Sequence, residues 1–169
     1  MIAFRIRQRW RRRWTNATGA YALALPAGTY RLVASDAALR YAFVFAGGTS
    51  FETATQFVEH PDSIDRVDLR VTPGVRLNGT VADSTGARVS GILVTAFDAS
   101  GNRVAMVNTS TAGAFDVVLL PGTYRLTATD PQARYGAVTI PSIVIAAATP
   151  PQPVTLVLLN TLRRRTVTH

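Results

Sequence analysis

The chain has 169 residues, of which 47% are apolar and 8% aromatic, enough for one or two small hydrophobic cores and inconsistent with wholesale disorder. The absence of cysteine excludes a disulfide scaffold, a thiolate metal site and a cysteine nucleophile. All 18 basic residues are arginine, which excludes lysine chemistry, and two histidines, His60 and His169, are too few for a multi-histidine metal centre. We therefore expect no metal and no cofactor.

The net charge of +8 is concentrated at the two ends of the chain. Six arginines lie within residues 1–14 and three within residues 163–169, so that nine arginines face ten acidic residues over residues 15–162. A nucleic-acid-binding domain usually carries its cations on a folded face. Nucleic-acid association through the arginine tails is therefore the weakest of three functional hypotheses.

The first 14 residues alternate between apolar and basic side chains. This period of two predicts an amphipathic strand rather than a basic helix. The alternation also places two tryptophans beside arginines, which would permit base stacking together with phosphate contacts. The apolar members of the pattern are Ile2, Phe4, Ile6, Trp10 and Trp14.

Residues 19–41 predict a strand, a tight turn at Gly28 and a second strand. Gly47-Gly48 lies between two apolar runs and predicts an inserted hairpin. Val67–Val71 predicts a further strand, and the short segment Thr72-Pro73-Gly74 predicts a boundary between two touching domains.

The second half of the sequence has short β-rich runs at a spacing of about ten residues, which is typical of a β-sandwich. A Pro121-Gly122 turn separates two of these runs, and a proline-rich stretch precedes the last. The predicted strands cover residues 92–97, 103–108, 114–120, 123–129 and 154–159.

The chain contains an internal repeat. When Gly19 is aligned with Gly113, residues 19–41 and 113–135 are identical at 12 of 23 positions without a gap. The aligned pairs include Gly28 with Gly122 and Tyr30 with Tyr124. A tyrosine that follows a glycine turn at a strand start fits a buried structural residue whose hydroxyl bonds to the backbone, so we expect these four residues to be structural.

The sequence of the second half resembles the carboxypeptidase regulatory-like domain family. The matching motifs are Leu77-Asn78-Gly79-Thr80-Val81, Asp83-Ser84-Thr85-Gly86 and Leu120-Pro121-Gly122-Thr123-Tyr124. The resemblance implies a seven-stranded, transthyretin-like sandwich without catalysis, often found in tandem in exported, cell-surface or periplasmic proteins. The turn Thr111-Ala112-Gly113 lacks the carboxylate that many relatives have there, so we expect no cation at this turn.

We therefore expect an all-β protein of tandem Ig-like or transthyretin-like Greek-key β-sandwiches, the first of them incomplete. The predicted parts are a truncated repeat over residues 1–72, a complete sandwich over residues 75–160 and a basic tail over residues 161–169. The repeat offset of 94 puts the counterpart of Arg76 about 18 positions before Met1, so the opening strand of the first copy is missing from this sequence. An unpaired strand edge favours β-strand addition, so we expect partners among other domains of the same or neighbouring chains.

We expect a non-enzymatic structural or interaction module of an exported or cell-surface protein, although the chain shows no signal peptide and no transmembrane segment. The alternative is a carbohydrate-binding module, because exposed aromatic rings on a sandwich can stack on sugars. The candidate ligand-binding residues are Trp10, Trp14, Tyr41 and Tyr135.

Overall fold

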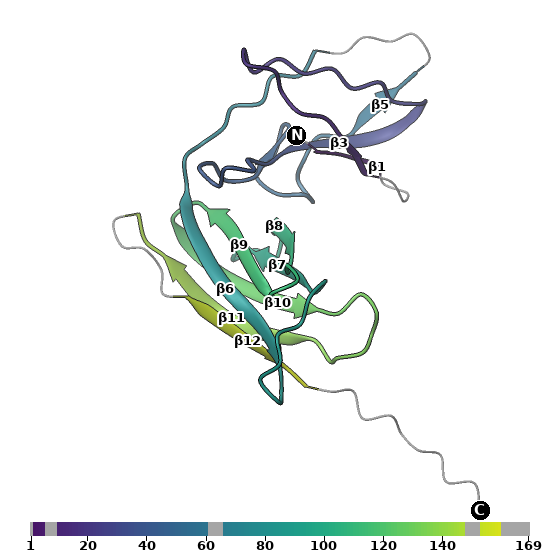
Figure 1. Ribbon diagram of the computed structural model, residues 1–169. Helices are drawn as coiled ribbons and strands as arrows, with labels where there is room; N and C mark the ends of the chain where they lie inside the picture. Colours follow the sequence, from purple (N-terminus) through teal and green to yellow (C-terminus); the bar gives the residue numbers. More distant parts are fainter. Residues whose placement is uncertain (1, 6–9, 61–65, 148–152, 160–169) are drawn as a thin grey trace, which may run out of the picture.

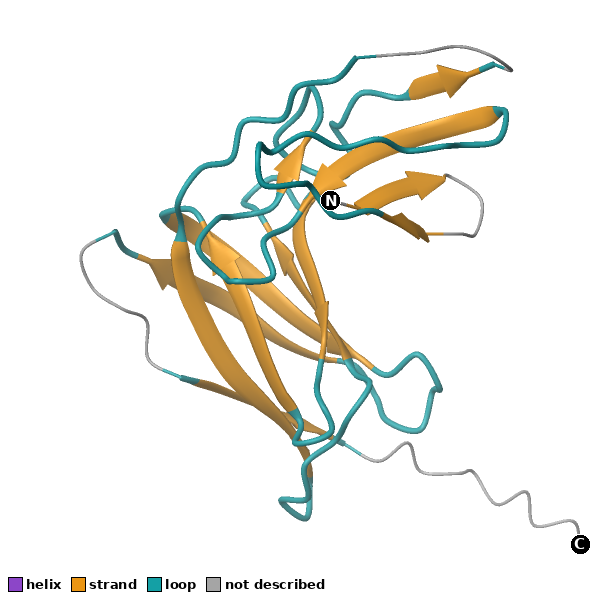
Figure 2. Cartoon of the chain, turned by 45° about the horizontal axis from the view of Figure 1, so that its top comes forward, coloured by secondary structure: helices purple, strands orange, loops and turns teal. Residues whose placement is uncertain are grey.

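The computed structural model describes residues 2–5, 10–60, 66–147 and 153–159, and the described chain is built of strands and loops without a helix (Figures 1 and 2). The expected all-β fold class is confirmed. The N-terminal half, residues 2–72, lies above the C-terminal half, residues 75–159, in Figure 1. The predicted basic tail, residues 161–169, lies outside the described residues.

The C-terminal half is a sandwich of two sheets. One sheet has the strand order β12-β6-β9 and the other the order β11-β10-β7-β8. Alternate side chains of both sheets face inward and are fully or nearly fully buried, including Leu77, Phe115, Leu126 and Leu156. The strands are β6 (Val75–Asp83), β7 (Leu93–Phe97), β8 (Arg103–Asn108), β9 (Ala114–Leu119), β10 (Gly122–Thr129), β11 (Val138–Ile145) and β12 (Val154–Leu158).

The sequence pattern does not predict β11, which contains Pro141. Proline cannot donate a ladder hydrogen bond and is confined to edge strands and bulges. β11 is an edge strand, and its register with β10 shifts between Tyr124 and Leu126, opposite Ile143 and Ile140. Pro141 lies within that irregularity, which explains why a proline is compatible with the strand.

The N-terminal half contains one sheet, in which β3 (Gly28–Ala34) is central. Its neighbours are β1 (Ile2–Arg5), which pairs in turn with β2 (Trp10–Arg12), and on the other side β4 (Val44–Phe45) and β5 (Phe57–Glu59). The expected hairpin around Gly47-Gly48 is wrong, because β4 and β5 both pair with β3 and not with each other. The intervening residues 46–56 form turns.

The N-terminal alternation does not form one continuous strand. β1 and β2 are antiparallel neighbours, and Ile6 lies among residues outside the description. β1 also pairs with β3, in the register that β7 has with β10. Phe4 of β1 lies opposite Arg31 of β3, and Phe97 of β7 lies opposite Arg125 of β10. Arg125 follows Arg31 by 94 positions, which is the offset of the internal repeat.

The second layer of the N-terminal half lacks strands. Residues 20–27 and 66–72 run without assigned strand structure, although Leu23, Leu25, Val67 and Leu69 pack against buried Leu32 and Ala46. The predicted strand Val67–Val71 is therefore wrong, as is the first strand expected within residues 19–41. The physical reason is the absence of a partner: the counterparts of both segments in the C-terminal half, β9 and β12, pair with the central strand β6.

Candidate functional site

The glycine–tyrosine turn recurs in both halves with the same geometry. Gly28 and Gly122 have φ angles of 156° and 159°, which side-chain-bearing residues rarely adopt. The Tyr30 hydroxyl donates to the Pro26 carbonyl at 2.7 Å, and the Tyr124 hydroxyl donates to the Leu120 carbonyl at 2.9 Å. In both turns the ring is tied to the carbonyl four residues earlier.

The two tyrosines differ in burial. Tyr30 is 2% exposed, whereas Tyr124 is only half-buried, so the expectation of a buried ring is met by Tyr30 and only in part by Tyr124. Its ring borders an open hollow beside the turn that contains Asp98. Partial burial, together with the negative charge of Asp98, raises the pKa of Tyr124.

An aspartate–arginine turn also recurs. Asp36 accepts hydrogen bonds from the backbone of Ala38 and Arg40 and from the Arg40 guanidinium, and Asp130 accepts the equivalent bonds from residues 132 and 134. The Arg134 hydrogen bond is the main cause that lowers the pKa of Asp130 to about 2, and Arg40 likewise lowers the pKa of Asp36. Both carboxylates are therefore fixed anions at neutral pH.

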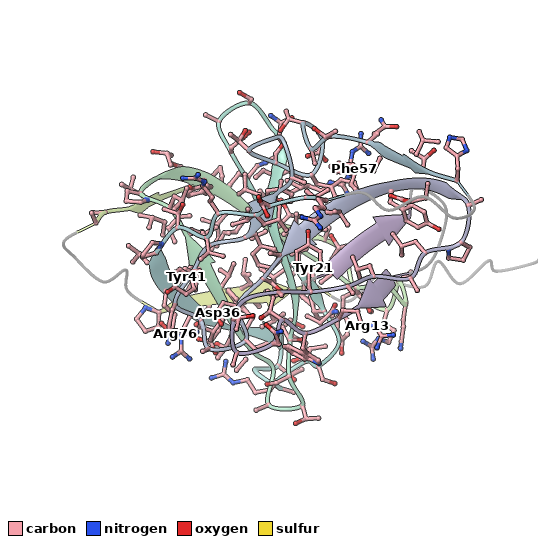
Figure 3. The ribbon with its side chains drawn as sticks, turned by 90° about the horizontal axis from the view of Figure 1, so that it is seen from above. Arg13, Tyr21, Asp36, Tyr41, Phe57 and Arg76 are labelled. Carbon is pink, nitrogen blue, oxygen red and sulfur yellow. The ribbon has the colours of Figure 1, made fainter. Side chains whose placement is uncertain are left out.

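A cleft of about 370 Å³ lies between the two halves of the chain. The N-terminal half contributes Trp14, Asp36 and Tyr41 to its wall, and the C-terminal half contributes Asn108 and Asp116. The Asp116 carboxylate accepts a hydrogen bond from the Arg76 guanidinium at 2.8 Å. Figure 3 labels Asp36, Tyr41 and Arg76. Aromatic rings beside oriented carboxylates and an amide are chemically suited to a polar ring such as a sugar.

The structure brings together two of the four predicted ligand-binding residues. Trp14 is 75% exposed and Tyr41 is half-buried, and both line the cleft. Tyr135 lies elsewhere, partly buried against the core of the C-terminal half. Trp10 lies in β2, and its side chain lies outside the described residues.

Besides sharing the cleft, the two halves are joined by a direct contact between Phe51, Glu52 and Arg103. None of these residues was among the predicted site residues. The Phe51 amide donates to the Arg103 carbonyl at 2.9 Å, and the Arg103 amide donates to the Glu52 carboxylate at 2.7 Å. The Arg103 guanidinium also pairs with Glu52 and lies 4.3 Å from the centre of the Phe51 ring. Phe51 and Glu52 belong to the turns at residues 46–56, which contain the insertion, so the position of the insertion was the available signal. We call this contact the clasp.

The charge of Glu52 responds to the clasp. Burial raises the pKa of its carboxyl, but the hydrogen bonds from the Arg103 side chain and backbone outweigh burial and lower the pKa overall. Glu52 is therefore ionised under neutral conditions, which preserves its pairing with Arg103.

The described part of the chain holds no group of three or more His, Cys, Asp or Glu side chains placed to bind a metal ion. Nor does any helix there have the length and apolarity needed to cross a bilayer. The contacts described above are hydrogen bonds, ion pairs and a cation–π contact.

Comparison with known proteins identifies the C-terminal half. The model of the carboxypeptidase regulatory-like domain matches residues 76–159. No curated protein matches the sequence. Similar solved structures include the dioxygenase domain of a dioxygenase–carbohydrate-binding fusion from Streptomyces sp. SirexAA-E, with 16% identity over 52% of this chain and 80% of that chain and a TM-score of 0.37.

Two further similar structures cover most of this chain. The minor pilin of Streptococcus agalactiae is 14% identical over 96% of this chain and 73% of that chain, with a TM-score of 0.41. The Bacillus anthracis TIE protein is 15% identical over 86% of this chain and 28% of that chain, with a TM-score of 0.43. At these identities no functional residue transfers to this chain. The family match and the two-sheet sandwich agree over the same residues, and residues 76–159 of this chain belong to the carboxypeptidase regulatory-like domain family.

Proposed function

We propose that the chain is a non-catalytic structural and interaction module of an exported or cell-surface protein, acting as a spacer that presents other domains. The observation that carries this proposal is the clasp, since a spacer must hold its two halves at a defined angle. Three kinds of contact converge on Arg103: backbone hydrogen bonds, an ion pair and a cation–π contact with Phe51. Partners are other protein domains, reached by β-strand addition.

The spacer proposal is tested by measuring the distance between the halves. The chain has no native cysteine, so Val58→Cys on β5 and Val157→Cys on β12 allow specific spin labelling at two exposed strand positions. We expect pulsed electron–electron double resonance to give one narrow distribution of distances between the two spin labels. A broad distribution in the otherwise unaltered protein would contradict a spacer role.

Carbohydrate binding is the second candidate, because the cleft combines Trp14 and Tyr41 with the oriented carboxylate of Asp36. Removing one stacking ring typically costs about 1 kcal/mol or more of affinity. We expect Trp14→Ala and Tyr41→Ala each to weaken binding on a polysaccharide array at least fivefold. Tyr135→Ala is the matched control, since Tyr135 follows an arginine as Tyr41 does but lies outside the cleft. Equal losses in all three variants would argue against the cleft.

A further inference from the structure

The N-terminal half contains an open groove where the C-terminal half has a strand. The groove has a volume of about 440 Å³ and is lined by Tyr21, Leu23 and Leu25 from one segment and by Val67 and Asp68 from another. Leu32 and Phe57 also line it, and Figure 3 labels Tyr21 and Phe57. We call it the strand groove.

The internal repeat identifies what occupies the equivalent space. Tyr21 corresponds to Phe115 of β9, 94 positions later. Val67 corresponds to Val154 of β12, 87 positions later, and two equivalent hydrogen bonds support this second offset. The Ala42 amide donates to the Thr72 carbonyl at 3.0 Å, and the Gly136 amide donates to the Leu159 carbonyl at 2.9 Å. Between β9 and β12 lies β6, antiparallel to the first and parallel to the second.

Equivalent side chains are less buried in the strand groove, where no described strand lies, than beside β6. Leu156 and Leu158 of β12 are 1% and 0% exposed, whereas the corresponding Leu69 is half-buried and Val71 is 51% exposed. The same holds on the other side of the groove, where Tyr21, Leu23 and Leu25 are half-buried and their counterparts Phe115, Val117 and Leu119 are each 2% exposed. This apolar surface stays accessible because no described segment covers it.

The groove also specifies one residue of its occupant. In β6 the residue opposite Phe115 is Gly79, and a Cβ there would lie 2.5 Å from both the Phe115 ring and the Val154 carbonyl. In the N-terminal half the hydroxyl of Tyr21 donates to the Val67 carbonyl, so the Tyr21 ring crosses the equivalent space. A strand entering the groove has room only for glycine opposite Tyr21.

We propose that the strand groove binds an extended segment of a separate partner polypeptide, antiparallel to residues 20–25 and parallel to residues 67–71. The segment follows the pattern of β6, with apolar residues at alternate positions and glycine opposite Tyr21. Backbone pairing on both sides supplies affinity, and the alternate apolar side chains complete the core against Leu32 and Leu69. This inference deepens the proposed interaction function by naming the chemistry of the partner.

A synthetic peptide with the sequence of Val75–Asp83 tests the proposal against the full chain. We expect saturable one-to-one binding in calorimetry, and about tenfold or greater slowing of amide hydrogen exchange in residues 20–25 and 67–71, with no change in β9 or β12. The same peptide carrying Gly79→Leu should not bind. Equal binding of both peptides, or protection confined to another strand edge, would overturn the proposal.

Two further arms keep the result decisive. Tyr21→Phe retains the ring and frees the Val67 carbonyl, so this variant should bind the peptide at least as tightly. The same nine residues joined ahead of Met1 by a short Gly/Ser linker reach an effective concentration of about 1 mM, which reveals weak pairing. The proposal fails if this fusion gains no exchange protection in residues 20–25, or if the unaltered protein protects these residues by self-association. Neither failure alters the distance measurement between Val58→Cys and Val157→Cys, so the spacer proposal is judged separately.

Discussion

Single residues in this chain are held by local backbone hydrogen bonds that recur at equivalent positions. The side chain of Asp130 is fully buried and accepts two backbone and two guanidinium hydrogen bonds, and Asp36 makes the equivalent turn with 17% of its side chain exposed. Leu39 and Ala133 both have a φ angle of 55°, which non-glycine residues rarely adopt. The carboxylate bonds hold each turn in this unfavourable conformation.

The turn at Asp130 should be sensitive to acid. Its pKa is lowered to about 2 in the folded protein, so the carboxylate stabilises the fold at and above its ordinary pKa, and this contribution is lost as the pH falls from about 4 to about 2. We expect the protection of the Gln132 and Arg134 amides, measured as their exchange rate relative to an unfolded chain at the same pH, to fall over that range. Asp130→Asn should remove most of this pH dependence, whereas Asp36→Asn should leave it intact. Unchanged acid sensitivity in Asp130→Asn would show that other carboxylates dominate.

At the scale of elements, the N-terminal repeat differs from the C-terminal repeat by one insertion, which lies between β4 and β5. β4 and β5 pair with the two ends of β3, as the two ends of the single strand β11 pair with β10. At one end of these strands the repeat offset of 94 is kept, since Val44 lies opposite Ala34 and Val138 lies opposite Ala128. At the other end it is lost: the residues opposite Gly28 and Gly122 are Glu59 and Ile145, which are not 94 positions apart. The extra residues form the turns that carry Phe51 and Glu52 to Arg103, at the start of the edge strand β8.

The clasp should limit movement between the halves. Arg103→Ala removes the ion pair and the ring contact but keeps the backbone bonds, so we expect a broader distance distribution between labels at positions 58 and 157 without unfolding. The free energy of unfolding should fall only slightly, by about 1 kcal/mol or less, because the Arg103 and Glu52 side chains are each 37% exposed. Arg134→Ala is the control, since its ion pair with Asp130 lies within one half. Equal broadening in both variants would contradict a specific role for the clasp.

At the scale of the whole molecule, the two halves differ in how completely their cores are covered. The sandwich over residues 75–159 closes two sheets on one another, whereas the N-terminal half has one sheet and an opposing layer without strand pairing. Burial of apolar surface is the main driving force of folding. The C-terminal half therefore has the larger share of stabilising core.

Fragments test this asymmetry. We expect residues 75–160 alone to unfold in one cooperative transition in urea, and residues 1–72 alone to unfold at lower denaturant concentration with a shallow transition. Circular dichroism follows both fragments. Comparable midpoints and slopes would show that the uncovered groove has little effect on stability.

Sequence reasoning predicted the all-β fold and most strands of the C-terminal half, because alternation and glycine turns are local signals. It missed the edge strand β11, because Pro141 argues against a strand. It also predicted strands at residues 19–27 and 67–71, which form no strands because no described strand pairs with them. Of the ligand-binding candidates, Trp14 and Tyr41 meet in one cleft and Tyr135 does not. Those outcomes depend on which segments become neighbours, and neither hydrophobic period nor residue type encodes that directly.

The clasp gives the pair of repeats a polarity. Phe51 and Glu52 come from the preceding repeat and Arg103 from the following one, and β11 carries no equivalent insertion. If the two halves were joined in the reverse order, each could retain its fold, but the insertion would face the wrong neighbour. The angle at this joint therefore depends on which repeat comes first.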